Sequence, residues 1–498
     1  MNFYHLIVNL KPIYLPILLL TAQISLIKPA SAQNSVQATP VDNSSPRICP
    51  ANLPSEIQKI TTRPLLAKAR WGIAVETLSG GKTLYSQERD KYFIPASNVK
   101  LLTSAAALTR LGSDFRIRTS IYATDSPKQS LLLVGRGDPS FSNPQLRELV
   151  RQLQAKNYTQ IEELKVSDRY FQGTTTHPTW EWEDVQYYYG TIVNSLILNQ
   201  NAVGLTIYPQ KVGNPLNYVW SDPLAVWGRP VANESLTSEA NSAANLQLIG
   251  IPGKSLLKIQ GQLPVGSQPE SQSLAVIDPA KYFTDSFQVA LLSVGIKVKA
   301  VKFLSTTEAP NPETEVAFVE SPPLTDLLME VNQNSNNLYS EVLLRTLGAI
   351  KQPKQDYDVS VVGLSTIKDT LKQIGVDPQS YIIVDGSGLS RHNLVSPDSL
   401  IQTLKAMDKS PYASVYRQSL PASGMNGTLK NRFGNAVNLI QAKTGTMTGV
   451  VALSGYITPT DYEPLVFSII VNQSDQKAIA TRQSIDEVVI LLTRLRRC

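Results

Sequence analysis

Three short motifs contain side chains that together could perform covalent catalysis. They are Ser97-Asn98-Val99-Lys100, Ser335-Asn336-Asn337 and Lys443-Thr444-Gly445. A serine hydroxyl attacks a carbonyl carbon efficiently only when a neighbouring base removes its proton. A lysine can be that base once burial and a nearby positive charge lower its pKa, and Lys443 could supply the charge. The motifs therefore indicate acyl transfer through Ser97, with Lys100 as the base.

The sequence around Ser97 distinguishes it from the other serines of the chain. A serine three residues before a lysine also occurs at Ser25, Ser79, Ser255, Ser365 and Ser474. After Ser97, apolar residues recur at helical spacing from Leu101 to Leu111, and Gly112 provides a stop. A helix that begins at Ser97 places Lys100 on the same face and Ser97 at the positive end of the helix dipole.

The second and third motifs are each open to a simpler interpretation. Ser335 could pass on a proton and Asn337 could bind a peptide backbone, with a helix expected over 338–347, but this Ser- and Asn-rich stretch could also be a plain polar loop. Lys443 comes at the end of a strand-like segment, 438–442, where it could bind substrate or be a solvated charge at a sheet edge. The order of the motifs along the chain favours the catalytic interpretation.

The elements that must position these motifs lie at the two ends of the chain. Alternating residues predict one hairpin over 71–94. Two apolar runs around the turn Pro459-Thr460-Asp461 predict a second hairpin over 450–471, followed by a long helix over 478–495. We expect an α/β (α+β) fold in which an antiparallel sheet is flanked by helices.

The chain of 498 residues is too long for one ordinary core. Between the first two motifs, short strand-like runs alternate with Gly, Pro and Asn turns, which indicates inserted β-rich accessory domains. We therefore predict a catalytic domain split between residues 49–117 and 304–498, with residues 118–303 as the inserted accessory region.

The N-terminus has the pattern of an export signal. Lys11 precedes an apolar stretch, and Ala30-Ser31-Ala32 offers the small residues that a signal peptidase needs. We predict a signal peptide over 1–32 and a flexible leader over 33–48, and hence a secreted protein with no transmembrane anchor after cleavage. The alternative is an uncleaved membrane anchor, although polar residues interrupt the apolar run.

Composition limits the classes of partner and of site. Removal of residues 1–32 would lower the net charge from +6 to a mild +4, because these residues hold two lysines and no acids. No dense Lys/Arg run is interleaved with aromatic residues, so nucleic acid is not an expected partner. Cys49 and Cys498, the only cysteines, could form a disulfide in an exported chain or remain two free thiols. The chain has three histidines, which argues against a histidine triad or a zinc site, and we expect no metal or cofactor.

The motifs in their setting resemble those of the low-molecular-mass class C penicillin-binding proteins, the D-alanyl-D-alanine carboxypeptidases and endopeptidases of peptidoglycan. Besides the three motifs, the resemblance includes Gly135-Arg136-Gly137-Asp138-Pro139, Asp385-Gly386-Ser387-Gly388-Leu389-Ser390-Arg391 and Gly427-Thr428-Leu429. It implies a transpeptidase/β-lactamase-like domain, with a second domain inserted after the nucleophile helix and a third nested inside the second. It also implies peptidoglycan stem peptides as substrates, β-lactam antibiotics as covalent inhibitors and a periplasmic location.

The resemblance also assigns roles to matching positions near the nucleophile. By this resemblance Ser97 forms the acyl-enzyme, and the N–H groups of Ser97 and Thr446 form an oxyanion hole. Lys443 and Thr444 would bind the substrate carboxylate, and Gly445 would let the backbone approach closely.

A pocket for the substrate side chain is implied in the same way. In similar proteins an aromatic and acidic segment of the second domain reaches the cleft and holds the amine of diaminopimelate. The matching segment here offers Asp184 or Glu183 for the amine, and Met447 would line the alkyl stem.

Two other functions remain open. A β-lactamase-like hydrolase would share Ser97, Lys100 and Lys443, but the chain has no Glu-x-x-Leu-Asn segment of the class A type. A non-catalytic peptidoglycan-binding scaffold would be free to lose the reactive residues, yet all of them are present.

Overall fold

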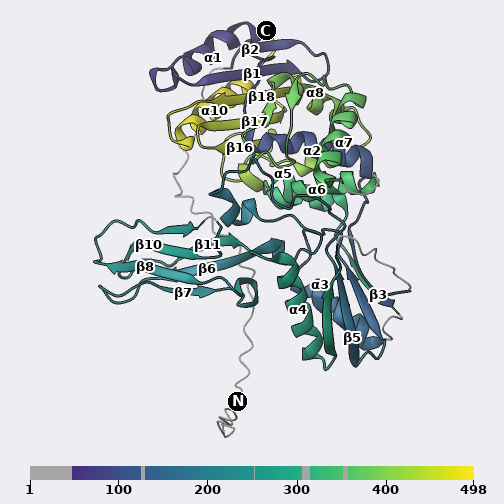
Figure 1. The fold of residues 1–498 in the computed structure, drawn as a ribbon. Helices are drawn as coiled ribbons and strands as arrows, with labels where there is room; N and C mark the ends of the chain where they lie inside the picture. The colour runs from purple at the N-terminus through teal and green to yellow at the C-terminus, as the bar shows by residue number, and fades with distance from the viewer. Residues whose placement is uncertain (1–46, 125–128, 252, 306–313, 352–356) are drawn as a thin grey trace, which may run out of the picture. The chain divides into compact units, whose positions relative to one another are not determined.

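The computed structural model describes residues 47–124, 129–251, 253–305, 314–351 and 357–498 (Figure 1). The predicted signal peptide and nearly all of the predicted leader lie outside the described residues. Within the described ranges, no helix combines the length and the apolar character needed to cross a bilayer.

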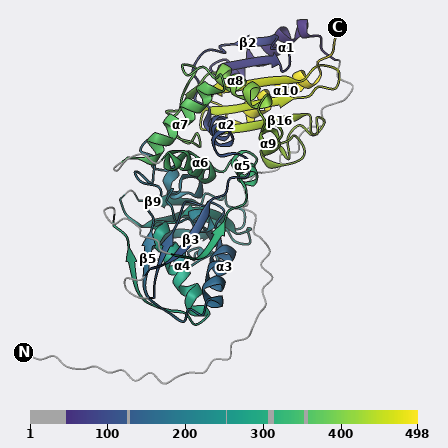
Figure 2. The same ribbon diagram turned by 90° about the vertical axis from the view of Figure 1, so that its right-hand side faces the viewer.

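Strands from both ends of the chain form the central sheet. Its order is β16-β17-β18-β1-β2, and each neighbouring pair is antiparallel. The strands are β1 (Arg70–Thr77), β2 (Thr83–Gln87), β16 (Ile440–Met447), β17 (Val450–Ile457) and β18 (Leu465–Asn472). Both views show the purple N-terminal strands beside the yellow C-terminal strands (Figures 1 and 2). The antiparallel sheet predicted from the two hairpins is confirmed.

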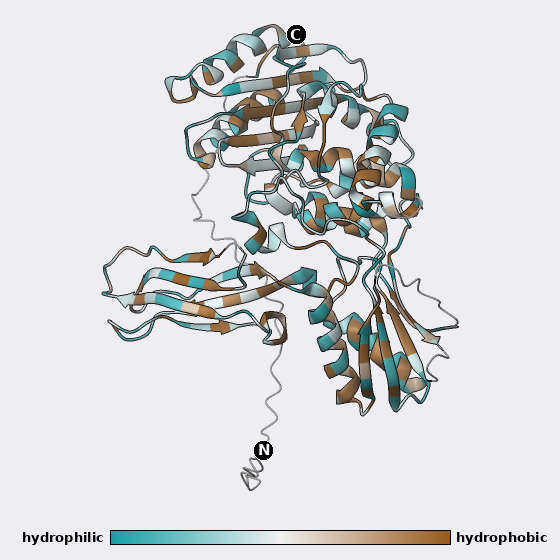
Figure 3. Ribbon diagram, viewed as in Figure 1, coloured by the Kyte–Doolittle hydropathy of each residue, from teal (hydrophilic) through white to brown (hydrophobic). Residues whose placement is uncertain are grey.

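Alternate residues of the central strands enter two different hydrophobic cores, as the two-residue period of a strand requires. Val451 belongs to one core and Ala452 to the other. The core that contains Val451 includes residues of α1 (Leu53–Thr61) and α10 (Ala478–Thr493). The core that contains Ala452 includes residues of α2 (Val99–Leu111) and α8 (Pro397–Asp408). Figure 3 shows hydrophobic residues along these strands. Because a hydrophobic core covers each face of the sheet, the position of edge strand β16 is fixed by packing.

Further helices pack beside α2 and carry the second motif. They are α5 (Leu324–Asn332), α6 (Asn337–Ile350), α7 (Val359–Gln373) and α9 (Ala413–Ser419), with a short pair of strands, β14 (Tyr381–Ile382) and β15 (Leu394–Val395), between α7 and α8. Helix α2 contacts both α6 and α7, so the first and second motifs meet across a buried helical interface.

Among the described residues, the accessory region contains three sheets, with the orders β12-β5-β4-β3-β13, β8-β10-β9 and β11-β6-β7. Their elements are β3 (Arg118–Thr124), β4 (Ser130–Val134), α3 (Asn143–Ala155), β5 (Gln160–Ser167), β6 (Ala202–Tyr208), β7 (Asn217–Trp220), β8 (Val231–Ser238), β9 (Gln247–Gly250), β10 (Leu257–Pro264), β11 (Glu270–Ala275), α4 (Pro279–Ser293), β12 (Lys297–Phe303) and β13 (Thr314–Glu320). Their apolar side chains form a core of their own. The region is β-rich, as predicted, and also contains two long helices.

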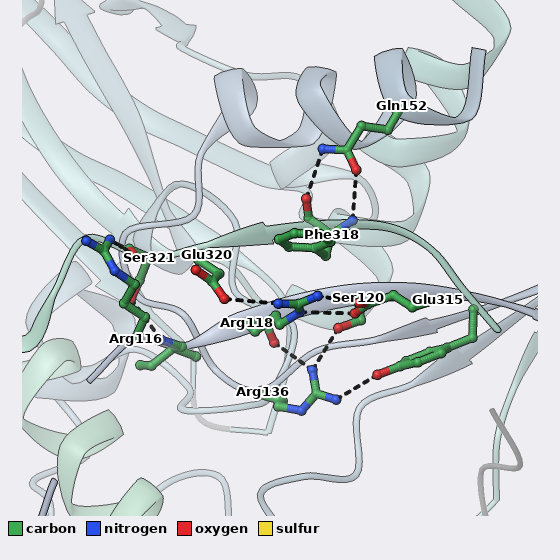
Figure 4. A network of polar contacts seen from close by, with 11 residues as sticks. Arg116, Arg118, Ser120, Arg136, Gln152, Glu315, Phe318, Glu320 and Ser321 are labelled. Atoms are coloured by element: carbon green, nitrogen blue, oxygen red, sulfur yellow. Dashed lines mark hydrogen bonds and ion pairs between the residues drawn. The ribbon is translucent and has the colours of Figure 1, made fainter. Parts of the chain in front are cut away.

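The strands by which the chain enters and leaves this region are neighbours in one sheet. Strand β13 pairs with β3, and Arg118 on β3 binds both Glu315 and Glu320 on β13 (Figure 4). The amide of Gln152 donates to Phe318 O at 2.9 Å and accepts from Phe318 N at 3.0 Å. An α3 side chain thus satisfies backbone groups of the edge strand that would otherwise need another partner.

Arg136, from the Gly135–Pro139 motif, joins the same network. Its guanidinium donates to Arg118 O at 2.8 Å, to Ser120 Oγ at 2.9 Å and to Tyr122 OH at 3.1 Å (Figure 4). The arginine of this motif therefore stabilises the accessory sheet.

The two chain ends are linked covalently. Cys49 and Cys498 form a disulfide with a Cα–Cα distance of 5.8 Å, and Ile48 lies beside Leu495 in a parallel bridge. Of the two states that the sequence left open for these thiols, the structure has the disulfide.

Candidate active site

Ser97 lies in one turn of 3₁₀ helix, Ala96–Asn98, that continues directly into α2. Asn98 Nδ2 donates to Ser454 Oγ on β17 at 2.9 Å, which ties the turn to the central sheet. Ala96 has a φ of 48°, a conformation that costs about 1–3 kcal/mol for a residue with a side chain. The surrounding contacts hold this strained residue, and it fixes the direction in which the chain enters the Ser97 turn.

Lys100 is fully buried, and its Nζ atom contacts the nucleophile, the second motif and the 385–391 loop. Nζ lies 3.0 Å from Ser97 Oγ, 2.7 Å from Asn337 Oδ1 and 2.6 Å from the carbonyl oxygen of Ser387. Burial lowers the pKa of Lys100 to about 7, although Asp385 and Glu341 act in the opposite direction. A lysine with this pKa is neutral in a substantial fraction of molecules near neutral pH and can accept a proton from Ser97.

Lys443 is also fully buried and contacts the second motif. Its Nζ donates to Ser335 Oγ at 2.8 Å and to the carbonyl oxygen of Thr444 at 2.9 Å. Burial, and then repulsion by Lys100, hold the pKa of Lys443 well below its usual range. Burial is the largest cause of the lowered pKa at both lysines, and the two positive charges also repel each other.

The second motif lies at the N-terminus of α6. Ser335 has a φ of 58°, and Asn336 caps the helix by accepting a hydrogen bond from Tyr339 N. Asn337 begins the helix, accepts from Lys100 through Oδ1, and donates through Nδ2 to the carbonyl oxygen of Tyr189 at 2.8 Å. The Tyr189 carbonyl therefore fixes the orientation of the amide, so that its oxygen faces Lys100.

A strained turn of the accessory region reaches the same helix end. Asn199, Gln200 and Asn201 have φ values of 50°, 59° and 52°, three consecutive left-handed residues, where L-residues other than glycine usually adopt this conformation singly. Gln200 Oε1 accepts from Asn336 Nδ2 at 2.8 Å. Both asparagines of the motif are thus held by the accessory region.

The sequence suggested that the third motif follows a strand over 438–442. In the structure the motif lies inside the longer edge strand β16 (Ile440–Met447). Outside the sheet, Ala442 N donates to Pro421 O at 3.0 Å, and Ser423 N donates to Ile440 O at 2.9 Å. Successive backbone groups of a strand point to opposite edges, so the N–H groups of Thr444 and Thr446 also point away from β17. Thr444 Oγ1 lies 2.8 Å from Thr428 Oγ1.

Glycine at position 445 lets β16 lie against the nucleophile turn. A Cβ atom there would be 2.7 Å from Pro95 O and 3.2 Å from Ser97 N. The strand therefore passes close to the Ser97 N–H group, and the adjacent Thr446 N–H is at the same edge. This arrangement can supply two backbone donors to an oxyanion.

The segment 385–391 forms a tight loop behind Lys100. Asp385 accepts hydrogen bonds from the N–H groups of Gly388 and Ser390 and from Trp180 Nε1. Glycine at 388 is needed because a Cβ atom would lie 2.0 Å from Ala96 O. The loop thus fits against the Ser97 turn and presents the Ser387 carbonyl to Lys100.

The acidic aromatic segment 180–189 contacts the 385–391 loop. Glu181 forms an ion pair with Arg391 at 2.9 Å, and Arg391 donates to Thr448 O, next to Met447, at 3.1 Å. Asp184 is partly buried, and burial raises its pKa despite a hydrogen bond from Tyr189. Glu183 is exposed on the same short segment. The structure thus links the segment to the loop beside Met447.

Several contact residues were not identified from the sequence. Gln200 lies in a segment with no chemical pattern of its own. Ser387, Thr428 and Trp180 lie in segments that the sequence singled out, but it gave these three residues no role. Glu341 carried a usable signal, because a charged residue interrupts an apolar helical pattern four positions after Asn337.

Known proteins resemble this chain over most of its length. Residues 53–495 match the D-Ala-D-Ala carboxypeptidase 3 (S13) family. A D-alanyl-D-alanine carboxypeptidase from Actinomadura sp. (strain R39) is 32% identical over 441 residues, which cover 84% of this chain and 81% of that protein. A penicillin-sensitive carboxypeptidase A from Dictyostelium discoideum is 29% identical, over 85% of this chain and 87% of that protein.

A solved structure shares the fold. Penicillin binding protein 4 from Haemophilus influenzae aligns with a TM-score of 0.76 at 21% identity, covering 87% of this chain and 97% of that one. This likeness confirms the predicted fold class.

Proposed function

We propose that this chain, which belongs to the D-Ala-D-Ala carboxypeptidase 3 (S13) family, cleaves the D-alanyl-D-alanine bond of peptidoglycan stem peptides through an acyl-enzyme on Ser97. Family membership confirms the resemblance that the motifs indicated. The observation that carries the proposal is the 3.0 Å contact between Lys100 Nζ and Ser97 Oγ. The lysine is buried and has a pKa of about 7, which suits it to be a general base.

Acylation would proceed from these contacts. Lys100 takes the proton of Ser97 as Oγ bonds to the carbonyl carbon of the penultimate D-alanine. The N–H groups of Ser97 and Thr446 would stabilise the oxyanion, and one such donor is typically worth about 10²–10³ in rate. The carbon–nitrogen bond to the terminal D-alanine then breaks, leaving an ester on Ser97.

The leaving amine needs a proton, and the second motif can supply it. Ser335 Oγ is 2.8 Å from Lys443 Nζ, so the hydroxyl can donate to the amine while it receives a proton from the lysine. Thr444, with Thr428 beside it, would bind the terminal carboxylate together with Lys443. Water then attacks the ester carbonyl carbon and the bond to Ser97 Oγ breaks, while Lys100 returns its proton to Ser97 Oγ and the proton lost by the attacking water restores Lys443. The same steps on a cross-linked peptide would give endopeptidase activity.

The substrate side chain would lie toward the acidic aromatic segment. Asp184 or Glu183 is proposed to pair with the free amine of a diaminopimelyl side chain, with Met447 along its stem. The partly buried position of Asp184 and the Glu181–Arg391–Thr448 link support this placement. If Asp184→Asn left the preference for free over acylated side-chain amines unchanged, Asp184 would have no such role.

We also propose a domain division, a location and a class of inhibitor. Strand pairing favours extending the inserted region from 118–303 to 118–320, because β13 belongs to the accessory sheet, with 49–117 and 321–498 as the catalytic domain. The periplasm is the compartment in which stem peptides occur and a disulfide persists. β-Lactams are the expected covalent inhibitors, in keeping with the penicillin-sensitive relative.

The test is covalent labelling by a fluorescent penicillin, with label release followed over hours. We expect a persistent label that Ser97→Ala abolishes. Rapid release would instead support the β-lactamase-like alternative. No labelling of the folded protein would support the non-catalytic scaffold and contradict the proposed reaction.

A further inference from the structure

Helix α6 places three polar residues on one buried face. Asn337, Glu341 and Arg345 are spaced four residues apart, and neighbours at this spacing lie on the same side of a helix. Glu341 and Arg345 are each 2% exposed. Buried charges are costly unless they are paired and hydrogen-bonded, so a helix that needed only stability would have apolar residues here.

Glu341 is bonded to the loop that contacts the base. Its Oε1 accepts from Gly386 N at 2.9 Å and from Ser387 N at 2.8 Å. The carbonyl oxygen of Ser387, in turn, accepts from Lys100 at 2.6 Å. One carboxylate oxygen therefore holds the backbone of Gly386 and Ser387 just before the carbonyl that accepts from Lys100, and Glu341 itself contacts no reacting atom.

We propose that Glu341 is a positioning residue for the acylation step, which holds the backbone of Gly386 and Ser387 so that the Ser387 carbonyl faces Lys100, and which places a buried negative charge beside this base. The proposal rests on the proposed function, in which Lys100 takes the proton of Ser97. The two parts of the proposal can be tested separately. The position of the loop depends on the acceptor oxygen of Glu341, and the basicity of Lys100 depends on the negative charge of Glu341.

The charge of Glu341 acts within a small buried group. Burial, and then Asp385, raise the pKa of Glu341, whereas hydrogen bonds from Ser387 and the charge of Arg345 lower it and favour the ionised carboxylate. Removing the negative charge of Glu341 removes an interaction that raises the pKa of Lys100. The groups that act on Glu341 or on its neighbours are Arg345 on α6, Asp385 in the loop, Lys100 on α2, Lys443 on β16, Asp358 before α7 and His177 in the accessory region.

Loss of the Glu341 charge should shift the pH dependence of acylation to lower pH. Acylation needs neutral Lys100, so its rate rises with pH through the pKa of Lys100. Without the charge of Glu341 that pKa falls, and the rising limb of the rate profile moves to lower pH. Since a weaker base transfers the proton less well, the plateau also falls.

Two variants separate charge from geometry. Glu341→Gln keeps an acceptor oxygen for the two N–H groups and removes the charge. Glu341→Asp keeps the charge but shortens the side chain, so the loop contacts weaken while the charge remains. Glu148→Gln, on the exposed face of α3, is the matched control for loss of a carboxylate.

The measurement is the second-order rate of labelling by a fluorescent penicillin across about pH 5 to 9, with thermal melting to verify folding. For Glu341→Gln we expect the rising limb to move down by roughly one pH unit and the plateau to fall about tenfold. For Glu341→Asp we expect an unmoved limb and a lower plateau. Glu148→Gln should match the wild type.

Two results would overturn the proposal. One is a Glu341→Gln profile that superimposes on the wild type, and the other is an equal limb shift in both Glu341 variants. If Glu341→Gln fails to fold, Glu341→Asp still decides, because a wild-type plateau or a displaced limb would contradict the proposed role. An unlabelled wild-type protein would refute the proposed function as well, which distinguishes the two failures.

Discussion

Substitution of Gly445 by alanine tests whether the close approach of β16 to the nucleophile turn is needed for acylation. An added Cβ atom would lie 2.7 Å from Pro95 O and 3.2 Å from Ser97 N. Non-bonded heavy atoms prefer separations of about 3.5–4.0 Å. The strand and the Ser97 turn must therefore separate by roughly 0.5–1 Å.

That displacement acts on the oxyanion donors. Thr446 N–H is on β16 and Ser97 N–H is on the turn, so separating the two elements spoils their convergence. A misplacement of about 1 Å can cost on the order of 10²-fold in rate, and loss of one oxyanion donor costs about 10²–10³-fold. We expect Gly445→Ala to be acylated by penicillin about 10²-fold more slowly, while the other contacts of Lys100 remain.

The assay is the second-order rate constant for labelling by a fluorescent penicillin, measured beside thermal melting. Gly434→Ala is the matched control, because a Cβ atom there meets nothing within 4 Å and its φ is not positive. The control should be acylated at the wild-type rate. A folded Gly445→Ala protein acylated within about threefold of the wild type would refute the reasoning about the strand and the oxyanion hole.

Three further predictions follow from the site and the chain ends. Because the pKa of Lys100 is about 7, the acylation rate should rise between about pH 6 and 8 and then level off; a flat profile would exclude Lys100 as the base. Gln200→Ala should slow acylation about 2–10-fold by losing one hydrogen bond, and Gln200→Glu, which keeps an acceptor oxygen, should restore the rate; equal defects would argue against this contact. Joint replacement of Cys49 and Cys498 by serine should destabilise the protein by about 2–4 kcal/mol and lower its melting temperature with little change in acylation at 25 °C, whereas an unchanged melting temperature would show that the disulfide contributes nothing.

The sequence by itself determined the elements whose patterns are local. The apolar runs within 450–471 and the helical spacing after Ser97 predicted β17, β18 and α2, because a continuous apolar run is typical of a strand buried on both faces and helical spacing is typical of a helix with a buried side. The three motifs also identified the reactive residue types. Local spacing is enough to place Ser97 and Lys100 together, since one helical turn separates them.

Only the tertiary structure decided how distant residues combine. The contacts of Lys100 with Asn337 and Ser387 join positions 237 and 287 residues apart, and no local pattern encodes them. The same holds for Gln200 and for the role of Glu341, whose neighbours come from other elements. The pKa values of the two lysines also depend on the tertiary structure, because burial is the largest cause at both and is a property of the packed site.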